Sequence, residues 1–103
     1  MIKVLLVKPN DVPRVMEIED ELETYQNLVE GYIECIYPFG DDNVCIVCND
    51  EGKLKGLAPN RFIKGDLIVG NFVIVAYQNG DFISLTDKQI TTYKKLFGSR
   101  SFI

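Results

Sequence analysis

Histidine is absent from this chain of 103 residues. Histidine is the usual general base at neutral pH and the commonest side-chain ligand of metal ions. Without it, catalysis would depend on a carboxylate pair, a lysine or a thiolate. We therefore expect a protein that is not an enzyme and that holds no metal ion and no cofactor.

Sequence motifs for phosphate binding and for nucleophilic catalysis are also missing. The chain has no Walker loop, no GxGxxG and no GxSxG. The segment Asn49-Asp50-Glu51-Gly52 is rich in oxygen ligands, as a calcium loop is. It lacks the carboxylate spacing and the final glutamate of an EF-hand loop, so we expect no calcium site there.

Cysteine is scarce, and its odd count of three indicates free thiols in a reducing compartment. Cys45 and Cys48 have the CxxC spacing of a zinc or redox site, but residues three apart in a strand point to opposite faces. Cys35 is the one further thiol, whereas a zinc site needs four ligands. We interpret the CxxC pair as core residues.

No long hydrophobic run is present. The apolar run at residues 2–7 is too short for a signal-peptide core or a membrane span. We therefore expect a soluble cytoplasmic protein that has no membrane partner.

Basic residues are outnumbered, which gives the chain a net charge of −4. An acidic chain repels a phosphate backbone, so we expect no non-specific nucleic-acid binding. Acidic residues gather between Glu17 and Glu34. This segment could imitate the charge of DNA, or it could be the solvated face of one helix; we favour the second reading because charge mimics carry denser acid.

What is present is an ordinary globular composition, with 47% hydrophobic residues. Apolar or alternating runs predict strands at residues 2–7, 14–18, 32–37, 44–48, 67–77 and 81–84. Apolar side chains at helical spacing predict two short helices, after Asp20 and after Thr86. The resulting order is ββαββ, a loop, then ββα. Short connections favour an α+β fold in which two short helices pack on a mostly antiparallel sheet of five to six strands.

The whole chain, residues 1–103, is predicted to form a single domain, with a tail at 99–103 that frays. The run at 44–48 is apolar on both faces, which indicates a strand covered on both sides. Residues 54–64 lose periodicity and are predicted to form an ordered loop, with one helical turn near 60–63.

Local signals place the ends of these elements. Asp20 with Glu23, and Thr86 with Gln89, have the spacing of a capping box at the start of a helix. Gly31 suits the left-handed position just past the first helix.

The pair Asn79-Gly80 predicts a tight type I′ hairpin turn, because that turn needs positive φ at both central positions.

Glu34 is a candidate functional acid because it lies inside a predicted strand, on the same face as Tyr32 and Ile36. A half-buried carboxylate there could act as a base, and the alternative is a rim charge that faces water.

The predicted loop carries a second candidate pair, Asn60 and Arg61. An amide and a planar guanidinium together suit a phosphate, a carboxylate or a base edge. Alternatively, Asn60 caps a short helix and Arg61 bonds a nearby acid such as Glu34 or Asp50. The predicted binding cleft lies beside this pair.

Tyr32 and Glu34 are expected to form the floor of this cleft, and Asn49 completes the set of candidate ligand-binding residues.

Several short motifs in a fixed order resemble domain-of-unknown-function family 3846. They are Met-Ile-Lys-Val-Leu-Leu-Val at residues 1–7, Gly-Tyr-Ile-Glu at 31–34, Cys-Asn-Asp-Glu-Gly-Lys-Leu at 48–54, Leu-Ala-Pro-Asn-Arg at 57–61, the run from Ile68 to Val75 and Ser-Leu-Thr-Asp at 84–87. The resemblance covers nearly the whole chain. It implies a small accessory protein of phages and conjugative elements with a host-facing role, and it assigns no functional residue.

The leading hypothesis is a non-enzymatic protein of a phage or mobile element that binds a host protein or a small nucleotide-like ligand, to counter a host defence. A second hypothesis is a small enzyme that works through Glu34 or a thiolate. A third is a dimerisation or scaffold module that uses Phe39 or the terminal Phe102-Ile103 as contacts.

Overall fold

The described part of the chain, residues 1–98 without the side chain of Asp41, folds as an α+β structure in the computed structural model. The elements in chain order are β1 (Ile2–Val7), β2 (Arg14–Ile18), α1 (Leu22–Val29), β3 (Ile33–Ile36), the short 3-10 helix η1 (Gly40–Asp42), β4 (Val44–Asn49), β5 (Pro59–Ile63), β6 (Asp66–Val69), β7 (Phe72–Gln78), β8 (Asp81–Ile83) and α2 (Asp87–Leu96).

Six strands form one antiparallel sheet, and β5 and β6 form a separate two-stranded sheet. The order across the large sheet is β2-β1-β7-β4-β3, and β8 pairs with β7. Every strand pair is antiparallel, as the short connections predict. The expected fold class is confirmed.

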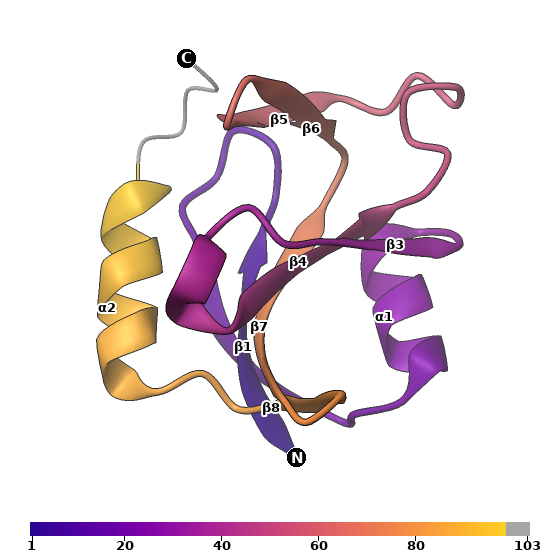
Figure 1. Cartoon of the computed structure of the whole chain (residues 1–103). Helices are drawn as coiled ribbons and strands as arrows, with labels where there is room; N and C mark the ends of the chain where they lie inside the picture. Colours follow the sequence, from indigo (N-terminus) through magenta and orange to yellow (C-terminus); the bar gives the residue numbers. More distant parts are fainter. Residues whose placement is uncertain (99–103) are drawn as a thin grey trace.

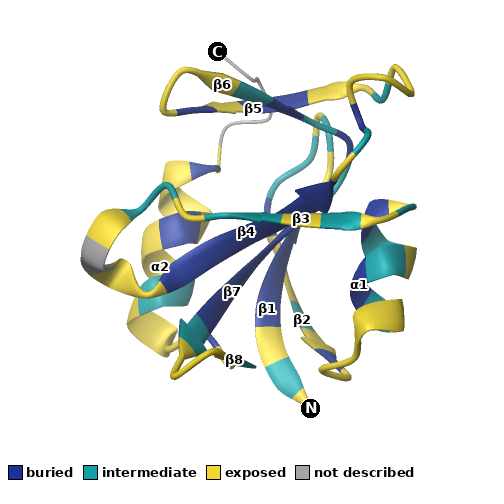
Figure 2. Cartoon of the chain, turned by 45° about the vertical axis from the view of Figure 1, so that its right-hand side comes forward, coloured by how far each residue is buried: buried dark blue, intermediate teal, exposed yellow. Residues whose placement is uncertain are grey.

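The two helices cover opposite faces of the large sheet (Figure 1). On one face, Tyr25 and Val29 of α1 are buried, and Tyr25 packs into a core with the side chains of β1, β4 and β7 that point toward α1. On the other face, α2 and the β5–β6 hairpin contribute Tyr93, Ile63 and Ile68 to a second core. The deepest residues lie in β1, β4 and β7, which are dark along most of their length in Figure 2.

Residues Val44–Asn49 of β4 are buried throughout, so the prediction of a strand covered on both sides is confirmed. The CxxC pair divides between the two cores: Cys45 packs on the α1 side and Cys48 on the α2 side. The period of two in a strand therefore separates the two sulfurs, and all three cysteines are free.

Two local signals are confirmed in detail. Asn79 and Gly80 have φ values of 53° and 83°, and they join the paired residues Gln78 and Asp81 at the β7–β8 turn.

The hydroxyl of Thr86 accepts from the main-chain N–H of Gln89, whose side chain in turn accepts from the Thr86 N–H. This reciprocal pair is the predicted capping box of α2.

The signals predicted for α1 are wrong. The N-cap is Glu21, and no side chain caps this end of α1. Asp20 instead accepts a hydrogen bond from the hydroxyl of Tyr25 at 3.1 Å. At the other end the left-handed residue is Glu30, with a φ of 65°, and not Gly31.

The predictions of a loop at 54–64 and of one long strand at 67–77 are also wrong. Residues 59–63 form β5 rather than a helical turn, and the long apolar run breaks at Gly70 into β6 and β7. Gly70 has a φ of 73°, which a residue with a Cβ adopts at a cost, so the chain turns there from the small sheet into the large one.

Neither described helix has the length and apolar composition needed to cross a bilayer. The predicted fraying at 99–103 and the predicted contact at Phe102-Ile103 lie outside the described residues. Phe39, the other predicted contact residue, is half-buried and packs against the rings of Tyr93 and Phe97.

Candidate functional site

Asn60 and Arg61 are buried, with exposed fractions of 1% and 4%, because they lie in β5 where the hairpin meets the rest of the molecule. The Asn60 amide donates to the carbonyl of Val7 at 3.0 Å and to that of Gly70 at 2.7 Å. Its oxygen accepts from Arg61 at 2.9 Å. These bonds join β1, β5 and the turn before β7, so the amide has a structural role.

The guanidinium of Arg61 also bonds main-chain carbonyls. It donates to Asp11 at 2.6 Å and to Phe97 at 3.0 Å, which ties the β1–β2 turn to the end of α2. Burial lowers the pKa of Arg61, and the nearby Asp11 opposes that shift. The guanidinium therefore points inward, and neither predicted alternative, a cleft wall or a bond to Glu34 or Asp50, matches its position.

Asn49 ends β4 and is 6% exposed. Its amide donates to the carbonyls of Val29 and Glu30 at 3.0 and 3.3 Å, and its oxygen accepts from the N–H of Glu51 at 2.8 Å. These bonds satisfy main-chain groups at the end of α1, where helices leave carbonyls without partners. Asn49 therefore fixes the wall of the neighbouring pocket.

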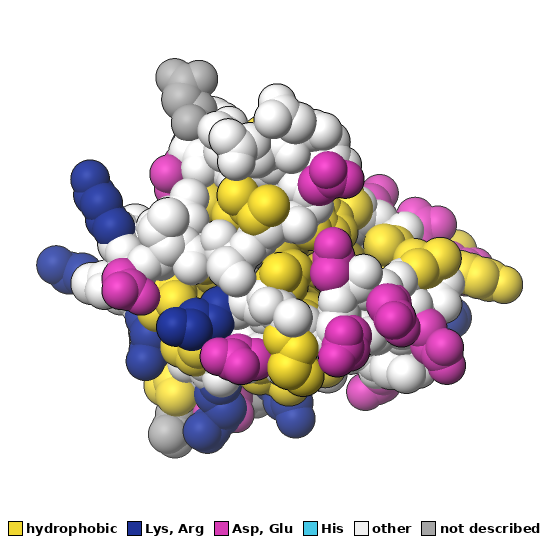
Figure 3. Space-filling view, turned by 90° about the horizontal axis from the view of Figure 1, so that it is seen from below, with side chains coloured by type: hydrophobic (Ala, Val, Ile, Leu, Met, Phe, Trp, Pro, Cys, Tyr) yellow, Lys and Arg dark blue, Asp and Glu magenta, His cyan; other side chains and the backbone are white. Residues whose placement is uncertain are grey.

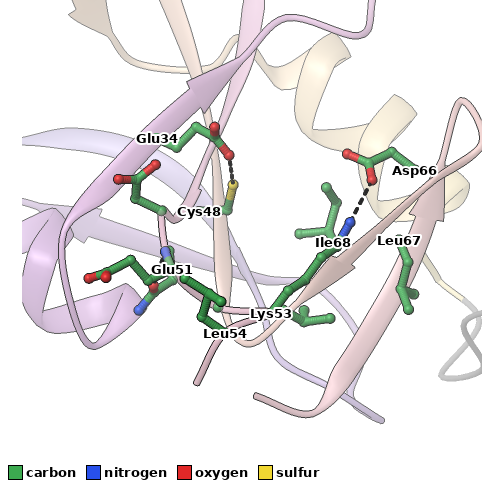
Figure 4. Close-up of a pocket in the computed structure, with 12 residues that line it drawn as sticks. Glu34, Cys48, Glu51, Lys53, Leu54, Asp66, Leu67 and Ile68 are labelled. Atoms are coloured by element: carbon green, nitrogen blue, oxygen red, sulfur yellow. Dashed lines mark hydrogen bonds and ion pairs between the residues drawn. The ribbon is translucent and has the colours of Figure 1, made fainter. Parts of the chain in front are cut away.

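Glu34 is exposed on β3 and lies at one side of a pocket of about 150 Å³. The pocket is bounded by the ends of β3 and β4, the following turn and the β5–β6 hairpin. The residues that line it are Glu34, Cys48, Asn49, Asp50, Glu51, Gly52, Lys53, Leu54, Asp66, Leu67, Ile68 and Val69. Figure 4 shows Glu34 and Asp66 on opposite sides of it.

Four carboxylates and one ammonium group line this acidic pocket, so its charge is strongly negative. The ammonium of Lys53 pairs with Asp66 at 3.0 Å on the exposed rim. The remaining carboxylates are those of Glu34, Asp50 and Glu51. The acidic pocket therefore suits cationic groups and hydrogen-bond donors.

The Cys48 thiol lies in the pocket wall and donates toward the Glu34 carboxylate over 3.9 Å. Burial and then the Glu34 charge raise the pKa of Cys48 to about 12. This thiol stays protonated at neutral pH and is a poor nucleophile. Among the described residues, no group of three or more potential ligands could hold a metal ion.

Tyr32 lies outside the acidic pocket, 68% exposed, beside a shallow hollow that it shares with Gln26, Asn27 and Lys55. The structure therefore brings together two of the five predicted site residues, Glu34 and Asn49, and separates Asn60 and Arg61 from them.

Sequence reasoning missed Lys53, Cys48 and Asp66 as pocket residues. Gly65 is the signal that could have identified Asp66, because the turn at Lys64 and Gly65 folds β6 back on β5 as a hairpin that reaches the end of β4.

Comparison with known families gives one match: the model of DUF3846, described as a domain of unknown function, matches residues 2–98. The comparison with curated proteins and the comparison with solved structures each found no match.

Proposed function

This chain belongs to the DUF3846 family, and from that premise we propose that it is a non-enzymatic accessory protein of a phage or mobile element that binds a basic region of a host protein. It acts in the cytoplasm of the bacterial host, where the bound protein belongs to a defence system. The binding region is the acidic pocket with the adjacent surface of β3.

The segregation of charge along the chain carries this proposal. Residues 15–52 contain eleven of the fifteen acidic residues and no lysine or arginine. Nine of the ten acids in this segment whose side chains the structure describes are exposed. Figure 3 shows acidic side chains gathered at one side of one face and most basic side chains at the other. Such a field attracts a basic partner and raises its association rate.

The size and charge of the acidic pocket favour a protein partner over a nucleotide-like ligand. Sites for drug-sized ligands enclose roughly 300–1,000 Å³, whereas this pocket holds about 150 Å³. Its carboxylates would also repel a phosphate, and the guanidinium of Arg61 is used inside the molecule. A basic side chain of a partner fits both the volume and the charge.

An enzymatic alternative has one observation in its favour. A hydrogen bond from Cys45 lowers the pKa of the half-buried Cys35 thiol. Cys35 lies on the α1 side of the sheet, away from Glu34 and the acidic pocket, so it lacks the neighbouring base that an activated thiolate uses. Mass spectrometry of host metabolites incubated with the protein tests this alternative, because turnover would overturn the binding proposal.

The proposal is tested by capture from host cells. The tagged full-length chain is compared with a Glu34→Lys/Asp50→Lys variant and with an Asp81→Lys/Asp87→Lys variant, which carries the same charge change at exposed sites outside the acidic pocket and outside residues 15–52. We expect one host protein to be retained by the wild type and the control and lost by the first variant. Equal retention by all three proteins contradicts the proposal.

A further inference from the structure

The strand β3 lies at one margin of the large sheet, and within residues 1–98 it pairs with β4 alone. In Figure 2 no helix or strand covers its outer side. The other margin, β2, follows Pro13 and starts with Arg14, which is bonded to Asp11 at 3.1 Å. The two margins therefore differ in charge: β2 carries one cation, Arg14, and one acid, Glu17, whereas β3 carries only the acid Glu34.

The hydrogen-bond register shows which main-chain groups of β3 point outward. The N–H of Asp50 donates to the carbonyl of Tyr32 at 2.9 Å, so Tyr32 points its main-chain groups toward β4. In an antiparallel pair this orientation alternates, so Glu34 also points toward β4. Ile33 and Cys35 therefore direct their N–H and C=O groups away from the sheet, where an added strand would bond them.

Side chains beside this open edge differ between the two faces. Glu34 lies on the face of the acidic pocket, which Asp50 and Asp66 also line. Ile33 and Cys35 lie on the opposite face, half-buried against the core under α1. A strand added here would have alternate side chains in an acidic and an apolar environment.

We propose that β3 is the docking edge for an extended segment of a partner protein in which basic and apolar residues alternate. The segment adds to the sheet as a further strand, bonded to the main chain of Ile33 and Cys35. Its lysine or arginine side chains reach the carboxylates of the acidic pocket, and its apolar side chains cover Ile33. This inference rests on the proposed function and specifies the partner and its mode of binding.

A second copy of this chain fits the edge less well. Two β3 strands paired antiparallel would place the Glu34 side chains of both copies on one short ribbon, and like charges across strands are destabilising. No lysine or arginine occurs anywhere in residues 15–52 to offset them. The charge of the edge therefore favours a basic partner.

The test uses the full-length protein and a short end-capped peptide in which lysine and valine alternate. Hydrogen exchange followed by NMR reports each amide of β3 separately. We expect peptide binding to slow exchange at Ile33 and Cys35 by at least about tenfold, while Glu34 and Ile36 are already protected by β4. A glutamate–valine peptide is the charge control.

Two variants separate strand addition from simple charge attraction. Cys35→Pro removes an outward N–H without removing a bond to β4, and proline is tolerated at such edge positions. Glu34→Lys reverses the charge on the pocket face. We expect each to weaken peptide binding on the order of tenfold by fluorescence anisotropy, and Glu19→Lys to leave it within about twofold.

A peptide with alternate main-chain nitrogens methylated provides a measurement that does not depend on how any variant folds. We expect it to bind on the order of tenfold more weakly than the unmethylated peptide. Equal binding of the two peptides, or no binding of either, overturns the docking edge.

The outcomes for the two proposals are distinct. If Glu34→Lys loses the captured host protein while Cys35→Pro keeps it, the docking edge is wrong and the proposed function stands. If sedimentation shows a dimer and hydrogen exchange shows that the Cys35 amide is protected without peptide, the strand that occupies the edge belongs to a second copy and the inference is wrong. If no host protein is captured but the peptide protects Cys35, the edge stands and the proposed function fails.

Discussion

Replacing Asn60 with alanine should strongly destabilise the fold, because this amide is buried and forms three hydrogen bonds inside the protein. The change leaves two carbonyls, those of Val7 and Gly70, and one Arg61 N–H without a partner. A buried polar group left unpaired costs roughly 1–3 kcal/mol. We expect a total loss of about 4 kcal/mol in the free energy of unfolding, a large share of the roughly 5–15 kcal/mol typical of a domain.

Urea unfolding followed by far-UV circular dichroism measures this loss. With a slope of about 1.3 kcal/mol per molar urea, the midpoint should fall by about 3 M. Asn27→Ala is the matched control, because Asn27 is exposed on α1 and alanine favours a helix. We expect the control to change stability by less than about 0.5 kcal/mol.

Two results would refute the reasoning. One is a loss below about 1 kcal/mol for Asn60→Ala, which would mean that the three groups find other partners. The other is a normal stability for Asn60→Asp, which keeps the shape of the side chain but cannot donate to Val7 and Gly70. Loss of partner binding without loss of stability in either variant would restore the binding role first predicted for Asn60.

Four further predictions use other features. Gly70→Ala should cost about 2 kcal/mol in urea unfolding, because φ is 73° and the new Cβ would lie 2.7 Å from Leu57 Cδ1; an unchanged midpoint contradicts this. Glu30→Gly should raise the free energy of unfolding by about 0.5–1 kcal/mol, because Glu30 has a left-handed backbone conformation and a negative charge at the C-terminus of α1. Glu30→Ala should raise it less, because it removes only the charge. Folding raises the pKa of Cys48 from 9.0 to about 12. The contribution of the protonated Cys48 thiol to the free energy of unfolding is therefore complete below pH 9 and is lost as pH rises toward 12. Urea midpoints at pH 8 and pH 10.5 should differ less in Cys48→Ala than in the wild type. Cys35 should be the first thiol to react with a disulfide reagent at pH 8, because its pKa is lowered whereas those of Cys45 and Cys48 are raised.

Signals that act over a few residues predicted much of the fold. The Asn79-Gly80 turn and the Thr86–Gln89 capping box depend on neighbours in sequence, and both are confirmed. The orientation of Cys45 and Cys48 follows from the period of a strand and is also confirmed.

The errors arose where a contact that the local sequence pattern does not show decides the structure. Asp20 has the spacing of an N-cap residue, but α1 begins two residues later. The Asp20 carboxylate therefore accepts a hydrogen bond from the hydroxyl of Tyr25 and does not cap the helix. The predicted loop at 54–64 forms a strand because β6 folds back to pair with it, and nothing within the segment itself indicates that partner.

The candidate site was half predicted for the same reason. Glu34 was recognised from strand alternation, whereas Asp66 begins β6, whose other residues were predicted to be part of a longer strand at 67–77. Arg61 looked like a binding residue because two of its partner carbonyls, those of Asp11 and Phe97, lie far away in sequence. Composition gives no indication that a guanidinium will be enclosed by main-chain oxygens.

The place of β7 in the sheet has a consequence for synthesis. β7 is next to last among the strands in sequence, yet it separates β1 from β4 in space. A nascent chain can form the β1–β2 and β3–β4 hairpins early, but these cannot join until residue 78 has left the ribosome. Until then both hairpins expose strands that await a partner, so this fold depends on protection by chaperones during synthesis more than the length of the domain suggests.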